Sequence, residues 1–413
     1  MAERGDSAKR ILVVCQHFWP EAFRINDVCD YFVSNGYEVD VLCGLPNYPS
    51  GVLSPGYSWL GPYRERNAGV EIFRVPEIPR KGNSSLRILL NYVSYPVASL
   101  LGLPRIMFRR YDKVYIYQLS PVMMAWAGIA VGKLRRIEVT MSVLDLWPEN
   151  LFSVLEIKNR FLRAVATKVS HWHYRRVDKL VALSQLMKAR LTEISALPSE
   201  KIEVLPQACE KFYEASTEDP VLRKKYQGTF NLVFTGNISP AQSFETMIAA
   251  ASQLKERGFH RIRWIIVGDG MSRETVTEQV RDAGLSEVFD FVGRVPPESI
   301  TSYFDIADGL VGCLVKSDLL EATIPAKVLS YVASGRPVLL AMDGEVSDLV
   351  QDAECGFVGP AGDVNQLVGN IERLYAMSDA ERVQLGENGR AYHFVHLERN
   401  VVLGKLEKFI FAQ

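Results

Sequence analysis

The 413-residue sequence lacks the motifs that mark several common classes of enzyme. Its six cysteines include no CxxC pair, and neither HExxH nor DxD occurs, so a metal site is not expected. No GxSxG sequence is present to anchor a hydrolase triad, and residues 268–270 (GDG) fall short of the GxGxxG dinucleotide fingerprint. Cys15, Cys43 and Cys313 lie in apolar, strand-like runs, which predicts reduced core cysteines and a cytosolic protein.

The sequence also lacks a convincing membrane span. Residues 114–132 are uncharged, but the stretch from Gln118 to Pro121 divides them into a predicted strand and a predicted helix. Residues 88–104 are uncharged as well, yet they contain too many polar side chains for a span, although they are compatible with a position against a membrane surface. The first ten residues are polar and lead directly into a strand, so no secretory leader is expected.

The net charge of −1 hides an asymmetry between the two halves of the chain. Residues 1–205 contain 27 Lys and Arg against 19 Asp and Glu, a balance of +8, whereas residues 206–413 contain 20 against 29, a balance of −9. A basic first half predicts an anionic partner, either a membrane surface or a phosphorylated substrate. Nucleic acid is not the expected partner, because the positive charge is gathered in patches.

Short apolar runs alternate with helical patterns, which predicts α/β structure with parallel strands. Because the chain is longer than one hydrophobic core usually supports, we expect two doubly wound domains at residues 1–205 and 206–394, followed by a final helix. The first half has predicted strands at residues 10–15, 38–43, 70–75, 113–119, 137–143, 179–183 and 202–205. The second half has them at residues 230–235, 263–267, 289–292, 309–315, 338–341 and 356–358.

Glycine or a cation follows four successive strands of the second half. Ligands of open α/β sheets bind beyond the carboxyl ends of the strands, and glycine lets a phosphate approach the backbone closely. The Arg294 guanidinium, beside Gly293, suits a base edge or a phosphate. Each strand end alone is also typical of a simple connection to a helix, but four on one sheet edge favour a nucleotide site.

Residues 321–340 are the most informative of these strand ends. Pro325 and Gly335 predict a helix over residues 325–333, whose first turn presents free N–H groups and a positive dipole end. Lys327 lies in that turn, which predicts a seat for a diphosphate. The alternative interpretation is an ordinary amphipathic helix with one solvated lysine.

Two basic patches occur in the first half. Residues 158–179, from Lys158 onward, carry seven cations against one acid, with apolar residues at helical spacing. This pattern is typical of a helix on a membrane surface, and equally of an outer face packed on the core. Residues 104–113 form a second patch with Arg105, Arg109 and Arg110, and two patches in one half favour the membrane interpretation.

Six segments follow one another in an order and spacing that resemble retaining glycosyltransferases of family 4: VALSQLMKARL, LPQACEKFY, VFTGNISPAQSFETMIAAA, WIIVGDG, FVGRVP and IPAKVLSYVASGRPVL. Two further segments, FWPEAFRINDVCDYFVSNGYEVDVLCGLPNYPSG and VLDLWPENLF, resemble the acceptor half of that family. The resemblance covers nearly the whole chain. Its branch is similar to bacterial cell-surface polysaccharide transferases, including those that act with N-acetylfucosamine or fucose in O-antigen, capsule and colanic acid synthesis.

The resemblance implies a GT-B fold, with two Rossmann-like domains facing across a cleft and a final helix, residues 395–413, packed back on the first domain. It implies transfer of a sugar from a nucleotide-diphosphate donor, a UDP-sugar, with retained configuration and with neither metal nor cofactor. It also implies a polyprenyl-diphosphate-linked saccharide as acceptor. The protein would then be cytoplasmic and peripheral on the inner face of the plasma membrane.

Site residues follow from the matched motifs. The candidate catalytic residues are Lys327, Asp145 and His17. The candidate donor-binding residues are Gly236, Asn237, Gln242, Gly268, Asp269, Arg294, Glu321, Pro325, Ala326 and Ser330. The candidate acceptor-binding residues are Arg24, Asn26, Asn47, Trp147 and Glu149.

The sequence departs from the family pattern at several of these positions. The two glutamates that the family carries eight residues apart correspond to Ala322 and Ser330, with Glu321 one residue early. The arginine and lysine that grip the diphosphate near the glycine loop correspond to Asn237 and Gln242. A histidine of the acceptor half corresponds to Leu144. Two alternatives therefore stay open: an inactive scaffold that partners another transferase, and a GT-B nucleotide-sugar epimerase.

Overall fold

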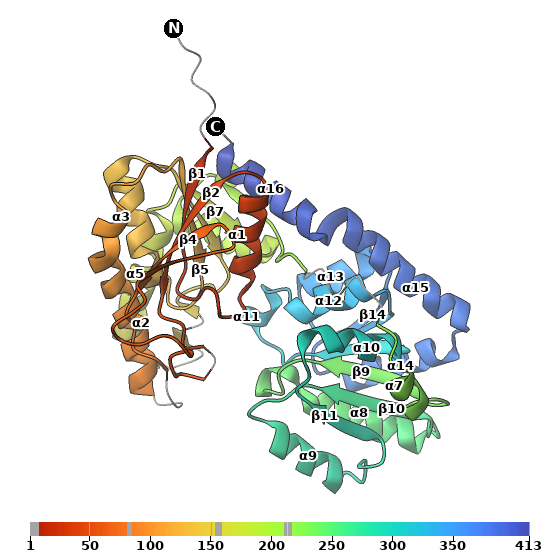
Figure 1. Ribbon diagram of the computed structural model, residues 1–413. Coiled ribbons are helices and arrows are strands. Elements are labelled where there is room, and N and C mark those ends of the chain that lie inside the picture. Colours follow the sequence, from red (N-terminus) through yellow and green to blue (C-terminus); the bar gives the residue numbers. More distant parts are fainter. Residues whose placement is uncertain are drawn as a thin grey trace. The chain divides into compact units, whose positions relative to one another are not determined.

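Two β-sheets organise the chain in the computed structural model (Figure 1). The first unit comprises Met1–Leu205 and Leu403–Gln413, and the second unit comprises Pro206–Val402. The structure describes residues 8–48, 50–80, 85–149, 151–152, 159–209, 213 and 217–412. Parts of the sequence predictions fall on residues 1–7, Pro49, Asn150, Lys158 and 210–212, which lie outside the described residues.

The first unit contains an eight-stranded sheet with the order β3-β4-β2-β1-β5-β6-β7-β8. Neighbouring strands are parallel except β3 and β4, which are antiparallel. The parallel strands correspond to the apolar runs predicted for the first half, whereas the polar edge strand β3 was not predicted. The strands are β1 (Arg10–Val14), β2 (Glu38–Gly44), β3 (Arg64–Asn67), β4 (Val70–Val75), β5 (Lys113–Gln118), β6 (Val139–Val143), β7 (Lys179–Ala182) and β8 (Ile202–Val204).

The second unit contains a six-stranded sheet with the order β11-β10-β9-β12-β13-β14, and every neighbouring pair is parallel. These strands correspond to the six runs predicted for the second half. They are β9 (Phe230–Thr235), β10 (Ile262–Val267), β11 (Phe289–Gly293), β12 (Gly309–Cys313), β13 (Val338–Ala341) and β14 (Gly356–Gly359).

Helices connect the strands in both units. The first unit has α1 (Arg24–Ser34), α2 (Ser85–Gly102), α3 (Trp126–Arg135), α5 (Arg160–Tyr174) and α6 (Gln185–Ser195), with short turns η1 (Leu103–Arg105), η2 (Val122–Ala125) and η3 (Ser199–Lys201). The second has α7 (Pro220–Lys225), α8 (Phe244–Glu256), α9 (Arg273–Asp282), α10 (Ile300–Asp305), α11 (Asp318–Glu321), α12 (Ala326–Ser334), α13 (Glu345–Asp352), α14 (Val364–Ala376) and α15 (Asp379–Tyr392), with short turns η5 (Pro240–Gln242), η6 (Pro297–Ser299) and η7 (His393–Leu397).

Two apolar cores, one on each face of its sheet, stabilise the second unit. Successive side chains of a strand point to opposite faces, and β9 follows this rule: Leu232 and Phe234 enter one core, and Val233 enters the other. Helices α8 and α14 cover the first core, and α12 and α13 cover the second. This arrangement is the doubly wound unit that the sequence predicted.

From the sequence we expect no membrane span and reduced core cysteines. In the described part of the chain, no helix is both long enough and apolar enough to cross a membrane. All six cysteine side chains are buried, and none of them forms a disulfide.

The C-terminal helix begins later than residue 395, the predicted start. A π-helical turn, η7, follows α15, and the helix α16 spans Arg399–Phe411. Glu398 breaks the helical path, with φ of −57° and ψ of 142°. Its carboxylate accepts the backbone N–H groups of Asn400 (2.8 Å) and Val401 (3.0 Å), so it caps the new helix. The prediction missed this because periodicity does not register a capping glutamate.

The end of α16 is anchored in the first unit. Glu407 accepts hydrogen bonds from the hydroxyl groups of Tyr31 (2.9 Å) and Tyr37 (2.6 Å). The buried Lys179 ammonium, at the start of β7, donates to the carbonyl oxygens of Phe409 (2.9 Å) and Ala412 (2.8 Å). Lys179 therefore places a positive charge at the negative end of the helix dipole.

We expect Lys179→Met to lower the free energy of unfolding of the first unit by about 1–3 kcal/mol, because two carbonyl groups lose a charged donor. Glu138, 2.7 Å from the same ammonium, also loses a partner. Urea denaturation, with hydrogen exchange of the α16 amides as the local readout, measures the loss. The exposed Lys133 provides the matched control, Lys133→Met. Equal losses in the two variants would contradict the assignment.

Candidate functional site

Three glycine-containing loops meet at the carboxyl edge of the second sheet. Gly236, Gly268 and Gly293 follow or end the adjacent strands β9, β10 and β11, and all three have positive φ. Gly236 donates a backbone hydrogen bond to Val267 (3.0 Å), and Gly268 donates one to Gly293 (2.9 Å). A Cβ added to Gly268 would lie only 1.9 Å from the Gly236 carbonyl oxygen, so this contact requires glycine.

Lys327 brings a cation to the first of these loops. The helix α12 starts after Pro325, whose ψ of 131° makes it the N-cap, and Lys327 is its second residue. The Lys327 ammonium donates to Gln242 Oε1 and lies 3.9 Å from the centre of the Phe234 ring. It lies 3.3 Å from the position that a Cβ on Gly236 would occupy. Among the described residues, no carboxylate forms an ion pair with it.

Burial lowers the pKa of Lys327 to about 7, and the nearby Cys313 acts on this pKa in the opposite direction. A bound anion would favour the charged ammonium and raise this pKa. The first amides of α12, at Ala326 and Lys327, have no intrahelical acceptor and add partial positive charge. The arrangement is suited to hold the diphosphate of a nucleotide.

The other predicted donor residues from the glycine loops lie close together. Asn237 Oδ1 lies 2.4 Å from the position of a Cβ on Gly270, and Ile238 donates its N–H to the Asp269 carbonyl (2.9 Å). The Asp269 carboxylate accepts the Gly270 N–H (2.9 Å) and lies 3.6 Å from the Arg273 guanidinium. A pocket of about 810 Å³ opens beside this loop, lined by Gly270, Met271, Arg273 and Phe291 among others.

Arg294 follows Gly293 in the sequence but does not bind the described residues of these loops. Its side chain is exposed, and no hydrogen bond or ion pair to it occurs within the described ranges. Arg273, which the sequence reasoning missed, lies closer, because its guanidinium is 3.6 Å from the position of a Cβ on Gly293. The sequence signal that could have identified Arg273 is its place in the first turn of the helix that follows the GDG loop.

The two candidates for the ribose contact lie in different surroundings. Ser330 is buried, and its hydroxyl donates within its own helix to the Ala326 carbonyl (3.4 Å). Glu321 ends α11 and packs against the loop after β13, where a Cβ on Gly344 would lie 2.2 Å from the Glu321 carbonyl. Both residues stay predictions for the ribose contact.

In the first unit, His17 forms a buried pair with Glu21 beyond β1. His17 Nδ1 lies 3.0 Å from Glu21 Oε2, and the imidazole stacks on the Phe23 ring at 4.9 Å. The other carboxylate oxygen of Glu21 accepts the backbone N–H groups of Asn47 (2.7 Å) and Tyr48 (2.6 Å), beyond β2. Glu21, which was not predicted, thus joins two predicted residues, His17 and Asn47.

Glu77, beyond β4, is a second carboxylate that the sequence reasoning missed. It is buried and accepts hydrogen bonds from the side-chain amides of Gln16 (2.9 Å) and Asn47. Burial raises its pKa from 4.5 to about 7, and the nearby His17 opposes the shift. An acid two residues after β4 was the only sequence signal.

Asp145 and Trp147 form a separate group beyond β6. The Ser120 hydroxyl donates to Asp145 Oδ2 (2.7 Å) and accepts the indole N–H of Trp147 (2.9 Å). Glu149 Oε2 is buried and accepts no hydrogen bond from the described residues.

The two remaining acceptor candidates lie at the start of α1. Asn26 accepts the Trp19 N–H (2.9 Å) and donates to the Glu21 carbonyl (2.7 Å), so it holds the loop after β1. Arg24 is the first residue of α1 and is partly exposed. The structure thus brings His17, Asn26 and Asn47 together through Glu21, and leaves Asp145 and Trp147 as a second group.

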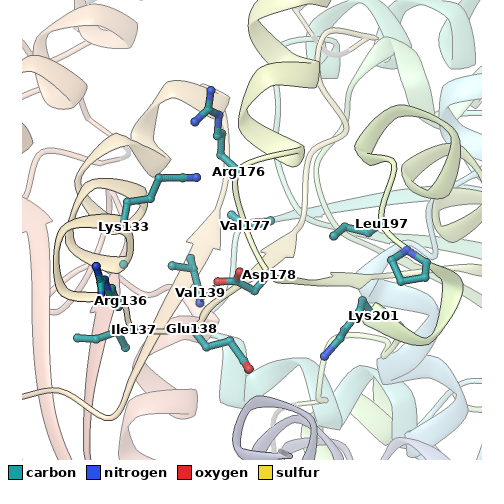
Figure 2. Close-up of a pocket in the computed structure, with 12 residues that line it drawn as sticks. Lys133, Arg136, Ile137, Glu138, Val139, Arg176, Val177, Asp178, Leu197 and Lys201 are labelled. Carbon is teal, nitrogen blue, oxygen red and sulfur yellow. Dashed lines mark hydrogen bonds between the residues drawn. The ribbon is translucent and has the colours of Figure 1, made fainter.

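A pocket of about 680 Å³ lies in the first unit, at the end of the strands opposite to the predicted acceptor residues (Figure 2). It opens at the amino ends of β6, β7 and β8, away from the strand-end loops. Lys133 and Arg136 extend from one side and Lys201 from the other (Figure 2). No predicted site residue lines it.

Two family matches cover most of the chain. Residues 22–208 match the family described as Glycosyl transferase 4-like domain, and residues 217–392 match the family described as Glycosyl transferases group 1. The chain is a glycosyltransferase of family 4. The matches fall on the two units separately, so the first unit of this transferase corresponds to the 4-like domain and the second to the group 1 domain.

Named relatives of this glycosyltransferase are distant. The amylovoran biosynthesis glycosyltransferase AmsK of Erwinia amylovora is 23% identical, over 86% of this chain and 87% of the relative. WcaI of Escherichia coli K12, named as a colanic acid biosynthesis glycosyl transferase, is 22% identical over 79% and 81%. The 2-deoxystreptamine glucosyltransferase of Streptomyces kanamyceticus is 23% identical, and that match covers 54% of this chain and only 58% of the relative.

Solved structures establish the fold of this glycosyltransferase. Sucrose-phosphate synthase from Thermosynechococcus elongatus aligns with a TM-score of 0.74 at 16% identity, over 98% of this chain and 99% of that one. HepE from Anabaena, solved in complex with UDP-glucose, aligns with a TM-score of 0.70 at 14% identity, over 98% and 100%. The transferase therefore has the GT-B fold expected from the sequence.

We expect the affinity for UDP to fall by roughly tenfold or more between about pH 6.5 and about pH 8.5, because Lys327 is charged below its pKa of about 7 and neutral above it. Isothermal titration calorimetry across this range measures the fall. In Lys327→Met, the only remaining pH dependence of the affinity should be that from the titration of UDP itself. The variant Lys405→Met, at an exposed lysine, should show the same fall in affinity as the wild type. Parallel profiles for the wild type and Lys327→Met would contradict the role.

Glu77 should make the protein less stable as the pH rises. Its pKa of about 7 lies above the ordinary 4.5, so the folded state binds more protons between these values, and stability declines through this window by at most about 3 kcal/mol. Glu77→Gln should remove this decline. Urea denaturation at several pH values tests it, with the exposed Glu193→Gln as the control. A decline that persists in Glu77→Gln would exclude Glu77 as its cause.

Proposed function

We propose that this transferase moves a sugar from a UDP-sugar to a saccharide carried on a polyprenyl diphosphate, in the synthesis of a cell-surface polysaccharide. The names of AmsK and WcaI support the pathway class, and the UDP-glucose complex of HepE supports the donor class. The family resemblance supports retention of configuration without a metal ion. A lipid-linked acceptor would make the protein peripheral on the cytoplasmic face of the inner membrane, as an enzyme of O-antigen, capsule or colanic acid type.

The observation that carries the proposal is the Lys327 ammonium at the Gly236 loop. An amphipathic surface helix would keep its lysine in water, whereas this one lies against the Phe234 ring and has no anionic partner among the described residues. Even a partly buried cation without a counter-ion is costly to the folded protein. Such a group is suited to an anion that arrives with the substrate, and a diphosphate supplies one.

Lys327 also accounts for a departure from the family pattern. Gln242 stands where the family has a lysine near the glycine loop, and the Lys327 ammonium donates to the Gln242 side chain. The positive charge therefore reaches the same loop from α12 instead of from the turn after β9. This exchange keeps a cation at the diphosphate although Asn237 and Gln242 are both neutral.

Catalysis would follow from charge stabilisation. Negative charge develops on the diphosphate as the bond to the sugar breaks. The Lys327 ammonium and the first amides of α12 are already oriented toward that charge, in a partly buried position where the interaction is stronger than in water. Glu321 would contact the ribose, and Arg294 and Arg273 the base or the diphosphate.

On the acceptor side, His17 is the candidate to contact the reacting hydroxyl group. Glu21 orients the imidazole through Nδ1, which leaves Nε2 for the acceptor. Asp145, held by Ser120, and Trp147 would bind the acceptor further along the same sheet edge. Arg24 and Glu149 complete the proposed acceptor set.

We expect Lys327→Ala to lower turnover by more than roughly tenfold while the protein stays folded, because a charge contact to the transition state is lost. Transfer of radiolabelled sugar from UDP-sugars into lipid extracts of membranes measures turnover, with Lys405→Ala as the matched control. Unchanged turnover in Lys327→Ala would contradict the catalytic role of Lys327. Transfer that requires a second protein would favour an inactive scaffold, and conversion of the donor without acceptor would favour an epimerase.

A further inference from the structure

The helix α2 has a row of apolar side chains that face outward. Six of them are 37% to 79% exposed: Leu89, Leu90, Val93, Val97, Leu100 and Leu101. Its buried face includes Asn91, which donates to the Ile78 carbonyl (2.8 Å), and Ser99, which donates to the Pro96 carbonyl (2.7 Å). Tyr92, Tyr95 and Ala98 are buried on that face as well, so α2 is apolar on both faces, whereas an ordinary surface helix keeps its outer face polar.

The helix α5 also exposes apolar side chains. Phe161, Leu162, Val165 and Trp172 are 44% to 74% exposed, whereas Ser170, His173 and Tyr174 are buried. Sequence periodicity alone allowed these apolar residues to pack on the core, and the structure excludes that interpretation. Both α2 and α5 pack against η2, and Phe108, 85% exposed, follows η1 at the end of α2. We call the apolar residues of α2 and α5, with Phe108, the docking face.

The charges on this face have one sign. Neither α2 nor α5 contains an aspartate or a glutamate, and α5 presents the exposed cations Arg160, Arg163 and Lys168. The Arg176 guanidinium lies 5.2 Å from the centre of the Trp172 ring, which combines a cation with an aromatic group at one position. Exposed leucine and phenylalanine bordered by cations are typical of helices that lie in the interface of an anionic membrane.

We propose that the docking face inserts its apolar side chains into an anionic lipid bilayer. A second copy of the chain is a poorer occupant, because a symmetric contact would bring the same cations together. The proposal deepens the proposed function, on whose lipid-linked acceptor it rests. It identifies the surface through which the first unit would reach that acceptor.

Sedimentation of the full chain with lipid vesicles tests the proposal. We expect binding to phosphatidylcholine vesicles that contain about one-third phosphatidylglycerol, weaker binding at high salt, and little binding to pure phosphatidylcholine. The double variants Leu101→Ser with Phe108→Ser, and Phe161→Ser with Leu162→Ser, should each weaken binding by roughly tenfold or more, because inserted apolar area is lost.

The matched control is Val221→Ser with Val383→Ser, which removes side chains of comparable exposure, 79% and 57%, from the second unit. Equal binding by the docking-face variants and the control overturns the proposal, as does absence of binding by the wild type. A dimer in light scattering that these variants dissociate, without vesicle binding, would assign the face to a second copy instead. Thermal stabilisation by UDP distinguishes failure of this proposal from failure of the proposed function. UDP should still stabilise each variant if only the docking face is misassigned, because UDP binding does not involve the docking face.

Discussion

A partly buried ammonium without a carboxylate partner among the described residues is the constraint on which the proposed donor site depends. Lys327 is held against the Phe234 ring and the Gln242 amide, and burial brings its pKa to about 7. The ammonium reaches this position because α12 begins at Pro325 and because Gly236 has no side chain to block it. The glycine contacts between neighbouring loops therefore fix both the shape of the site and the place of its charge.

The proposed acceptor side is organised by carboxylates instead of cations. Glu21 joins the loops after β1 and β2, and Glu77 joins the second of these loops to the end of β4. Both groups are buried, so a change at one loop is transmitted to the others through hydrogen bonds that have no solvent to replace them. His17 is positioned by this network more than by its own backbone.

Sequence patterns predicted the parallel strands and the glycine loops well, because apolar runs and strand-end glycines are local signals. They missed β3, whose residues RERN contain no apolar side chain, and they missed Glu77, whose partners Gln16 and Asn47 lie in the loops after two other strands. They also left the apolar residues of α5 ambiguous, since periodicity identifies a helical face but not the neighbour that covers it. The contact between Lys327 and Gln242 could not be predicted from the sequence, because it depends on the tertiary packing of α12 beside β9.

The anchoring of α16 has a consequence for biosynthesis. Tyr31, Tyr37 and Lys179 all bind residues 407–412, which the ribosome makes more than two hundred residues after the first unit's last strand, Ile202–Val204. At ordinary elongation rates this delay is roughly 10 to 40 s. Throughout it the nascent first sheet lacks a helix that its completed form requires, so its buried Lys179 must stay hydrated or bind a chaperone until translation supplies α16.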